Sequence, residues 1–257
     1  TACLLDEVLD MILKVLTYNI HKGFNMTGSE FTLHEIKKSI NEINADIVLL
    51  QEVVGSHAKH SKKISNWPKH PTQCEFLAED NWPYFQYGKN ATYPGRDHGN
   101  AILSKFPIVE TENINISTNR WEQRGLLHCT IQLPLEKSVH IFNVHLNLLE
   151  GGRKTQFGKI KERISSHVND KSPILIGGDM NDWTQNLHQD FITLTDFSES
   201  HVHLNKKFAQ SFPSFYPKLT LDRLYFRHLS ILSSTTLQDA HWKKLSDHLP
   251  MLVEFEI

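Results

Sequence analysis

The chain alternates between short, almost continuous apolar runs and longer segments in which apolar residues recur every third or fourth position. Continuous apolar runs bounded by turn residues are typical of strands covered on both faces of a sheet. Two such runs are joined near Pro134 and are expected to be antiparallel neighbours. By this pattern we predict strands at residues 13–19, 47–50, 84–88, 100–104, 126–133, 139–146, 174–178, 221–226 and 251–257.

Helical spacing dominates several of the segments between these strands. Thr32 and Glu35 form a Thr-x-x-Glu capping box, which predicts a helix that starts at Thr32. Its apolar face would consist of Leu33, Ile36, Ile40 and Ile43. A second long helix is predicted at 151–168, with shorter ones at 73–80 and 187–194. The basic residues on the 151–168 helix are interpreted as a solvated surface, with a substrate-steering patch as the alternative.

This mixed alternation continues through the whole chain, without an internal repeat, a low-complexity stretch or a linker. It favours an α/β protein in which two sheets pack face to face with helices outside. We expect a single domain over residues 11–257. The opening residues 1–5 are too short, and too acidic downstream, for a secretory signal. Residues 1–10 are expected to be a leader or an artificial extension, since Met11 resembles a natural start.

Polar residues follow the apolar run at 174–176, in the sequence Gly177-Gly178-Asp179-Met180-Asn181-Asp182. Alternation along an extended chain places Asp179 and Asn181 on the same side. The carboxylate of Asp179 can hold a water or a metal ion, and the amide of Asn181 can donate to a phosphoryl oxygen. The alternative for both is an Asx turn that only closes a loop.

Other polar clusters are built in a similar way. Three strand-like runs end at Asn19, Glu52 and His145, and Asp222 and Asp247-His248 border two further strands. A single strand-terminal Glu52 would be equally compatible with a surface carboxylate, and a single His145 with a structural histidine. Taken together, these residues predict that polar side chains from several strands meet at one site.

The order Asn, Glu, His, Asp-x-Asn, Asp, Asp-His resembles the endonuclease/exonuclease/phosphatase superfamily over residues 13–257. The resemblance implies a four-layer α/β sandwich, in which two packed mixed β-sheets are flanked by helices, as in pancreatic-type deoxyribonuclease. It also implies a site at the open end of the sheets. The implied reaction is Mg²⁺-dependent phosphoester hydrolysis by direct, in-line attack of water.

Phosphodiesters and hydroxide are both anionic, so their reaction needs positive charge near the phosphoryl oxygens. The resemblance makes Glu52 the first candidate ligand for Mg²⁺, with Mn²⁺ as a substitute and Asn19 and Asp247 completing the shell. It implies that Asp179 orients and deprotonates the water, while Asn181 contacts a phosphoryl oxygen.

Two histidines are implied to face the phosphate. His248 would contact a phosphoryl oxygen as an imidazolium that Asp222 orients, and His145 would face the phosphate from the other side. The family's Glu that supports the middle His has no counterpart here. Either Asp97 substitutes for it, or His98 itself touches phosphate.

Three further residues are candidates for substrate binding. Asn100 begins the run Gly-Asn-Ala-Ile-Leu-Ser, which resembles the family's central strand, so Asn100 is expected near the site. Arg96 is a candidate for a bidentate phosphate contact, with a solvated loop arginine as the alternative. Arg124 is a similar case.

Composition narrows the partners. The net charge of −2 argues against a protein that grips long duplexes through many phosphates, although a metal ion and a local patch still permit a nuclease. No apolar run approaches the ~20 residues of a membrane helix. The three cysteines are far apart and odd in number, which indicates no disulfide framework. We expect a cytoplasmic monomer, with export as an alternative.

The first functional hypothesis is a nuclease-like phosphodiesterase with a phosphodiester or phosphomonoester substrate, nucleic acid being the first candidate. The alternative is a phosphatase or phospholipase that acts on inositol phosphates or phospholipid head groups; only the shared chemical core of inositol phosphatases matches. A non-catalytic binding module is a third hypothesis. It predicts losses among Glu52, Asp179, Asn181 and His248, all of which are present.

Overall fold

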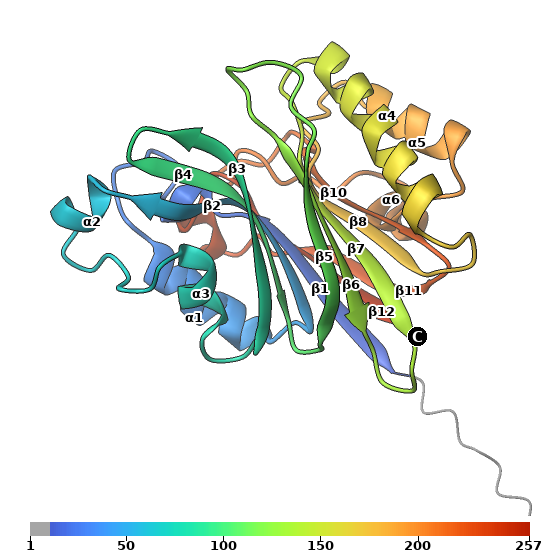
Figure 1. Cartoon of the computed structure of the whole chain (residues 1–257), viewed down its shortest axis with the longest axis horizontal. Helices are drawn as coiled ribbons and strands as arrows, with labels where there is room; N and C mark the ends of the chain where they lie inside the picture. Colours follow the sequence, from blue (N-terminus) through green and yellow to red (C-terminus); the bar gives the residue numbers. More distant parts are fainter. Residues whose placement is uncertain (1–10) are drawn as a thin grey trace, which may run out of the picture.

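The computed structural model describes residues 11–257, so the expectation for residues 1–10 lies outside the described part. Two six-stranded mixed sheets pack face to face (Figure 1). The first sheet has the strand order β11 (Ser230–Thr236), β12 (Met251–Glu256), β1 (Ile12–Asn19), β2 (Ile47–His57), β4 (Arg96–Ser104), β3 (Tyr84–Tyr93). The second has the order β5 (Ile108–Asn115), β6 (Gly125–Gln132), β7 (Ser138–His145), β8 (Ile174–Asp179), β10 (Asp222–Arg227), β9 (Ser198–Glu199).

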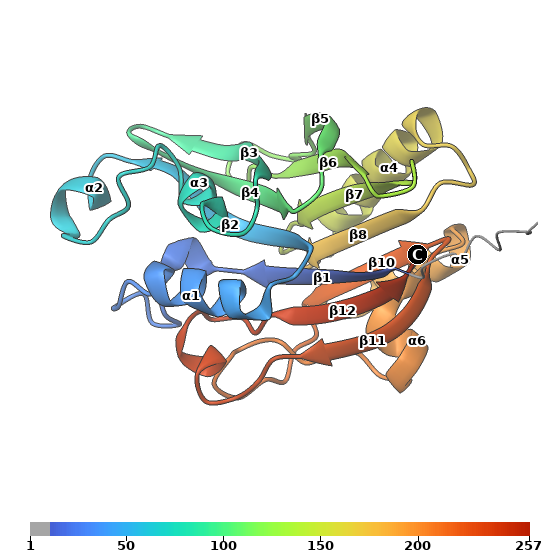
Figure 2. The same cartoon turned by 90° about the horizontal axis from the view of Figure 1, so that it is seen from below.

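Helices cover the outer faces of both sheets, which confirms the predicted four-layer α/β sandwich (Figures 1 and 2). On the first sheet lie α1 (Leu33–Ile43) and α3 (Gln73–Ala78), with α2 (His60–Lys63) nearby. On the second lie α4 (Glu150–His167) and α5 (Asn186–Leu194). The helix α6 (Ser200–Asn205) contacts β10 of one sheet and β11 of the other. Two 3₁₀ turns occur at His21–Gly23 and Trp242–Lys244.

Three apolar clusters correspond to the three interfaces between these layers. Leu13, Leu49 and Ile102 belong to the cluster between the sheets, where all three are fully buried. Separate clusters fill the interfaces between α1 and the first sheet and between α4 and the second. Burial of this apolar surface is the main stabilising contribution. In residues 11–257, no helix is long and apolar enough to span a lipid bilayer.

The predicted strands and the four predicted helices are all present, including the antiparallel pair β6 and β7. The predicted capping box at Thr32 is wrong. Its side chain makes no capping bond; instead, the hydroxyl donates to the carbonyl of Leu245 at 2.6 Å. A long-range contact therefore replaces the local one and ties the start of α1 to the loop before β12.

A buried polar link joins the two sheets at their middle. The amide of Asn143 on β7 donates to the carbonyls of Leu50 at 2.9 Å and Ala101 at 2.8 Å, and its oxygen accepts from Gln51 at 2.8 Å. All these side-chain groups of Asn143 are paired, so their burial carries little desolvation penalty. The link fixes the spacing of the sheets just below the ends of β2 and β7.

Candidate active site

Strand register brings the predicted polar residues together. Because β7 is parallel to β8, His145 lies beside Asp179, and because β10 is antiparallel to β8, Asp222 lies on the other side of Asp179. In the first sheet, β1 is parallel to β2 and Asn19 pairs with Gln51, next to Glu52. Four of these side chains lie at strand ends, at the last residues of β1, β7 and β8 and the first of β10. The prediction that a strand ends at Glu52 is wrong, because β2 continues to His57 and Glu52 lies at an irregularity in its pairing with β4.

Asp179 is the centre of this cluster and is 2% exposed. Its Oδ2 accepts a hydrogen bond from Asn19 Nδ2 at 3.1 Å and lies 3.4 Å from His145 Nε2 and 3.6 Å from His248 Nε2. Its Oδ1 accepts from the backbone N–H of Asn181 at 3.0 Å. One carboxylate therefore joins residues that are as much as 160 positions apart in the chain.

His248 lies between two carboxylates. Its Nδ1 is 2.7 Å from Asp222 Oδ2, and Asp179 faces its Nε2. Burial alone would lower the pKa of His248, but Asp222 and then Asp179 overcome this effect and raise the pKa to about 10. The ring of Phe212 packs 4.9 Å away. His248 is therefore an imidazolium at neutral pH, held in one orientation.

The pKa values of Asp179 and His145 are shifted in ways that favour their neutral forms. Burial raises the pKa of Asp179 to about 6, despite the lowering effect of the His248 charge. Burial, together with the charge of Arg124, holds the pKa of His145 well below its usual value. At neutral pH the cluster contains a carboxylate that can still accept a proton, a neutral imidazole and an imidazolium.

A steric constraint requires glycine at position 178. Gly178 has φ +135°, and a Cβ there would lie 1.9 Å from the carbonyl oxygen of Val144 on the neighbouring strand. Just beyond, Asn181 takes the left-handed conformation, with φ 48°, and its Nδ2 donates to the carbonyl of Leu146 at 2.9 Å. One N–H of the Asn181 amide remains for a substrate oxygen.

A buried ion pair that the sequence pattern did not indicate holds this loop. The carboxylate of Asp182 accepts from Arg223 Nη1 at 2.9 Å, and the Asp182 carbonyl accepts from Nη2 at 2.8 Å. Asp182 is 0% and Arg223 1% exposed. Arg153 lies 3.9 Å from the second oxygen of Asp182. Asp182 follows Asn181 and Arg223 follows Asp222, so the pair fixes the loop after β8 to the start of β10.

Glu52 carries the second anionic centre, and a lysine that the sequence analysis missed neutralises it. Glu52 has φ 57°, Lys22 in the 3₁₀ turn has φ 59°, and the two side chains form an ion pair. Burial would raise the pKa of Glu52, but the charge of Lys22 and its hydrogen bond hold it well below its usual range. Lys22 belongs to no motif that indicates a functional residue. The only signal in the sequence is its position three residues after Asn19.

The predicted metal ligands have suitable chemistry. Glu52 is an ionised carboxylate that attracts a cation, and Asn19 and Asp247 provide further oxygen donors beside the same turn. His21 joins them, because its backbone N–H donates to Asn19 Oδ1 at 3.1 Å and its Nδ1 is 4.0 Å from Asp247. Within residues 11–257 no three His, Cys, Asp or Glu side chains form a ready metal cluster, and the ammonium group of Lys22 is paired with Glu52.

Asn100 and Asp97 have structural partners. The amide of Asn100 donates to the carbonyls of Gly125 and Asn143, both at 3.2 Å, so both of its N–H groups link the two sheets. Asp97 accepts from Ser56 Oγ at 2.6 Å and from Tyr87 at 2.7 Å. Asp97 is thus not the partner of His145; the Nε2 atom of His145 lies 3.4 Å from Asp179 Oδ2.

Two of the three remaining substrate candidates border a cavity of about 500 Å³ beside the cluster. His98 and Arg124 line it, and the charge of Arg124 lowers the pKa of both His98 and His145. Burial is the larger cause for His98, whose pKa is about 4. Arg96 lies farther out, with its guanidinium 5.1 Å from the ring of Tyr93. Arg124 is itself paired with Glu122 at 3.0 Å.

Known proteins are similar to this chain in sequence or in fold. Residues 16–248 match the Endonuclease/Exonuclease/phosphatase family. The uncharacterized protein YbhP of Escherichia coli strain K12 is 38% identical over 98% of this chain and 99% of its own length. An endonuclease/exonuclease/phosphatase structure from Beutenbergia cavernae superposes with a TM-score of 0.79 at 21% identity, covering 96% of this chain and 72% of that one.

A humanized TDP2 from Danio rerio superposes with a TM-score of 0.71 at 14% identity, covering 96% and 99% of the two chains. At these identities the solved structures establish the fold alone. The family match extends over nearly the whole chain and includes every strand end that contributes to the cluster. This chain is therefore a member of the endonuclease/exonuclease/phosphatase family, whose enzymes hydrolyse phosphoester bonds and generally depend on a divalent metal.

Proposed function

We propose that this protein is a Mg²⁺-dependent phosphodiesterase that cleaves its substrate by direct, in-line attack of water. The observation that carries the proposal is the position of Asp179, within 3.6 Å of Asn19, His145 and His248. Hydrolysis of an anionic ester needs a base for water and positive charge for the phosphoryl oxygens. This arrangement contains both.

The proton inventory supports the role of each residue. Asp179, with a pKa of about 6, is ionised at neutral pH and accepts the proton of the attacking water. As the water oxygen bonds to phosphorus, the ester oxygen on the opposite side leaves. The imidazolium of His248 and the remaining N–H of Asn181 donate to phosphoryl oxygens, and neutral His145 donates from the other side.

Glu52, Asn19 and Asp247 are the residues that would hold Mg²⁺, with Mn²⁺ as a substitute. When bound, the ion would supply positive charge at the phosphate and at the departing oxygen. Lys22 would have to leave Glu52 for this to happen. Asp222 does not react; it keeps His248 protonated and oriented.

A nuclease-like substrate is the first choice, and the cavity beside the cluster supports it. Tyr93, His98, Trp121 and Arg124 line this cavity, and Trp121 is 77% exposed. Exposed aromatic rings next to a cation are suited to stacking with a nucleobase. The alternative is a phosphatase or phospholipase. Leu148 lies in the same lining and is 48% exposed, an aliphatic surface that favours a lipid head group with its chains.

A comparison of substrates in the presence of Mg²⁺ tests both the proposed reaction and the proposed substrate class. Plasmid DNA, RNA, abasic DNA, phosphoinositides and sphingomyelin are compared with the generic diester bis(p-nitrophenyl) phosphate, for the wild type and for His248→Gln. We expect diester hydrolysis that falls at least about a hundredfold in the variant. His203→Gln, a histidine on the outside of α6, is the matched control. Equal turnover in His248→Gln and wild type would disprove the assignment, and preference for a lipid would replace the nuclease hypothesis.

A further inference from the structure

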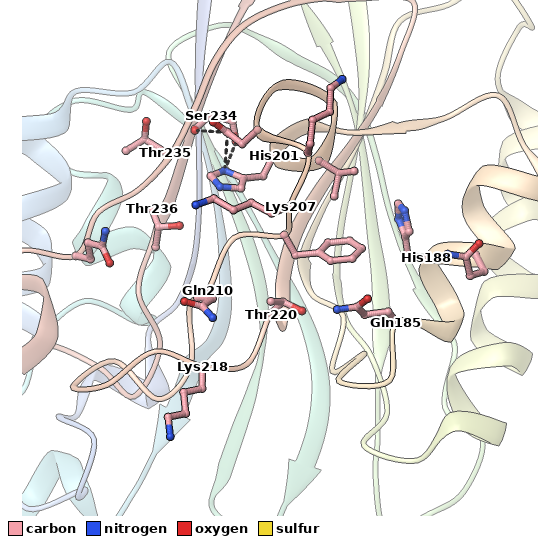
Figure 3. A pocket seen from close by; sticks show the side chains of 16 residues that line it. Gln185, His188, His201, Lys207, Gln210, Lys218, Thr220, Ser234, Thr235 and Thr236 are labelled. Atoms are coloured by element: carbon pink, nitrogen blue, oxygen red, sulfur yellow. Dashed lines mark hydrogen bonds between the residues drawn. The ribbon is translucent and has the colours of Figure 1, made fainter.

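A cavity of about 940 Å³ lies outside the catalytic cluster, in a region to which no role has been assigned. It lies between the start of α5, the helix α6, the segment 206–210 and the end of β11 (Figure 3). Its volume is in the range of ordinary ligand sites. Figure 3 shows polar side chains around its wall, with Gln185 and His188 on one side and Ser234, Thr235 and Thr236 on the other.

The wall of this cavity carries positive charge only. Three lysines line it, Lys206, Lys207 and Lys218, and none of the described lining residues is acidic. The ammonium group of Lys207 points across the hollow toward Thr236 (Figure 3). Lys206 donates to the carbonyl of His203 at 2.8 Å, and Lys218 lies 4.7 Å from the ring of Tyr216. Lys207 is therefore the cation within the cavity, and the other two lie at its border.

The rest of the wall provides neutral hydrogen-bonding groups. His201 lies 3.2 Å from Ser234 Oγ, and burial together with the charge of Lys207 lowers its pKa. His188 is 6% exposed, its Nδ1 is 3.2 Å from the Tyr225 hydroxyl, and burial and Arg223 lower its pKa to about 4. Neutral imidazoles, hydroxyls and amides beside an ammonium group suit a small oxyanion with several acceptor oxygens.

The cavity and the catalytic cluster share their supporting segments. Thr220 lines the cavity, two residues before Asp222. Gln210 also lines it and precedes Ser211, whose Oγ accepts from the backbone N–H of Asp222 at 3.3 Å. On the opposite wall, Gln185 donates its backbone N–H to the carbonyl of Asp182. The same segments therefore carry both the wall of the cavity and the side chains of the cluster.

We propose that this cavity is a second phosphate subsite, which binds a phosphate of the substrate other than the one that is cleaved. The inference rests on the proposed phosphodiesterase function and assigns to it a substrate with at least two phosphate groups. A short single-stranded oligonucleotide has this chemistry, because its phosphates follow one another along one backbone. A net charge of −2 does not oppose it, because one local subsite replaces an extended basic surface.

The test compares substrates with one and with several phosphates. In Lys207→Gln/Lys218→Gln, we expect KM for a short oligonucleotide to rise about tenfold with kcat unchanged, while KM for bis(p-nitrophenyl) phosphate stays as in wild type. Lys137→Gln/Lys171→Gln is the matched control. Lys137 precedes β7 and Lys171 precedes β8, so both lie at the opposite ends of these strands from the catalytic cluster. An oligonucleotide KM equal to that of the control would overturn the proposal. Wild-type inactivity on both substrates would instead refute the phosphodiesterase function.

A binding measurement separates the two sources of phosphate. With the inactive Asp179→Asn variant, anisotropy of a labelled oligonucleotide gives an affinity that we expect to weaken about tenfold when Lys207 and Lys218 are also replaced by Gln. If instead free inorganic phosphate alters turnover of bis(p-nitrophenyl) phosphate in wild type, and this effect is lost in the lysine variant, the cavity binds an effector. That outcome, like an unchanged affinity, contradicts a substrate subsite.

Discussion

Arg223→Met tests whether the buried pair with Asp182 holds the loop that follows β8. The substitution keeps much of the volume of the side chain but removes the charge and both hydrogen bonds, at 2.9 and 2.8 Å. Asp182, at 0% exposure, would then keep the backbone N–H of His188 at 3.2 Å, the hydroxyl of Thr184 at 3.4 Å and Arg153 at 3.9 Å, but no cation at hydrogen-bond distance. Breaking a buried pair from one side costs about 3–5 kcal/mol, a large fraction of the roughly 5–15 kcal/mol that stabilise a typical domain.

Urea denaturation followed by fluorescence measures this loss. We expect the free energy of unfolding to fall by about 3–5 kcal/mol in Arg223→Met, and by less in Asp182→Asn, because Nη2 still has the backbone carbonyl of residue 182. The double variant should be less destabilised than the sum of the two single variants, by at least about 1 kcal/mol. Under conditions where Arg223→Met remains folded, we also expect lower kcat, since Asp222 and Asn181 are no longer fixed to each other.

Two results would refute this reasoning. A loss below about 1 kcal/mol in Arg223→Met would mean that the pair contributes little net stabilisation, as replacement of buried pairs by apolar residues sometimes shows. Exact additivity in the double variant would mean that the two side chains do not interact. Arg227→Met is a control, because Arg227 lies on the same strand and its partner Asp196 is 58% exposed on its side chain.

Four further predictions concern the chemistry. Turnover of bis(p-nitrophenyl) phosphate should fall as pH decreases through about 6, because protonated Asp179 cannot accept a proton from water; a flat profile of kcat/KM between pH 5 and 8 would contradict this. EDTA should abolish turnover and added Mg²⁺ or Mn²⁺ should restore it, whereas EDTA-resistant activity would rule out the metal. Lys22→Met should tighten Mg²⁺ binding in calorimetry several-fold, because no ammonium competes for Glu52, and an unchanged affinity would remove Glu52 from the ligand set. Arg96→Ala should raise KM more than it lowers kcat if Arg96 binds substrate; an unaltered KM would mean that Arg96 is only an exposed residue at the start of β4, beside Tyr93.

Strand ends were the predictable part of this molecule. Where a buried apolar run stops, the next polar side chain lies at an edge of the sheet, and parallel neighbours such as β7 and β8 align their ends. This reasoning places His145 beside Asp179. The edge strands β5 and β11 were not predicted, because most of their side chains face solvent and show no apolar pattern.

Side-chain pairings between distant segments were not predictable. Lys22 and Glu52 meet because each takes the left-handed backbone conformation, Lys22 in the 3₁₀ turn and Glu52 within β2. This conformation is uncommon outside Gly and Asn, so neither residue type indicates it in the sequence. Arg223 and Asp182 are charged residues, for which average burial statistics predict exposure. Thr32 had a local capping partner in the sequence, yet the carbonyl of Leu245 is its acceptor.

Turnover by the Asp179→Asn variant is the most direct measurement of the central claim, that side chains from separate strands meet around one base. The amide keeps the shape of Asp179 but cannot take a proton from water. With Mg²⁺ and bis(p-nitrophenyl) phosphate, we predict that kcat drops at least about a hundredfold while cooperative unfolding is retained, and that Asp170→Asn in an exposed turn keeps wild-type kcat. Wild-type kcat in folded Asp179→Asn would contradict the account.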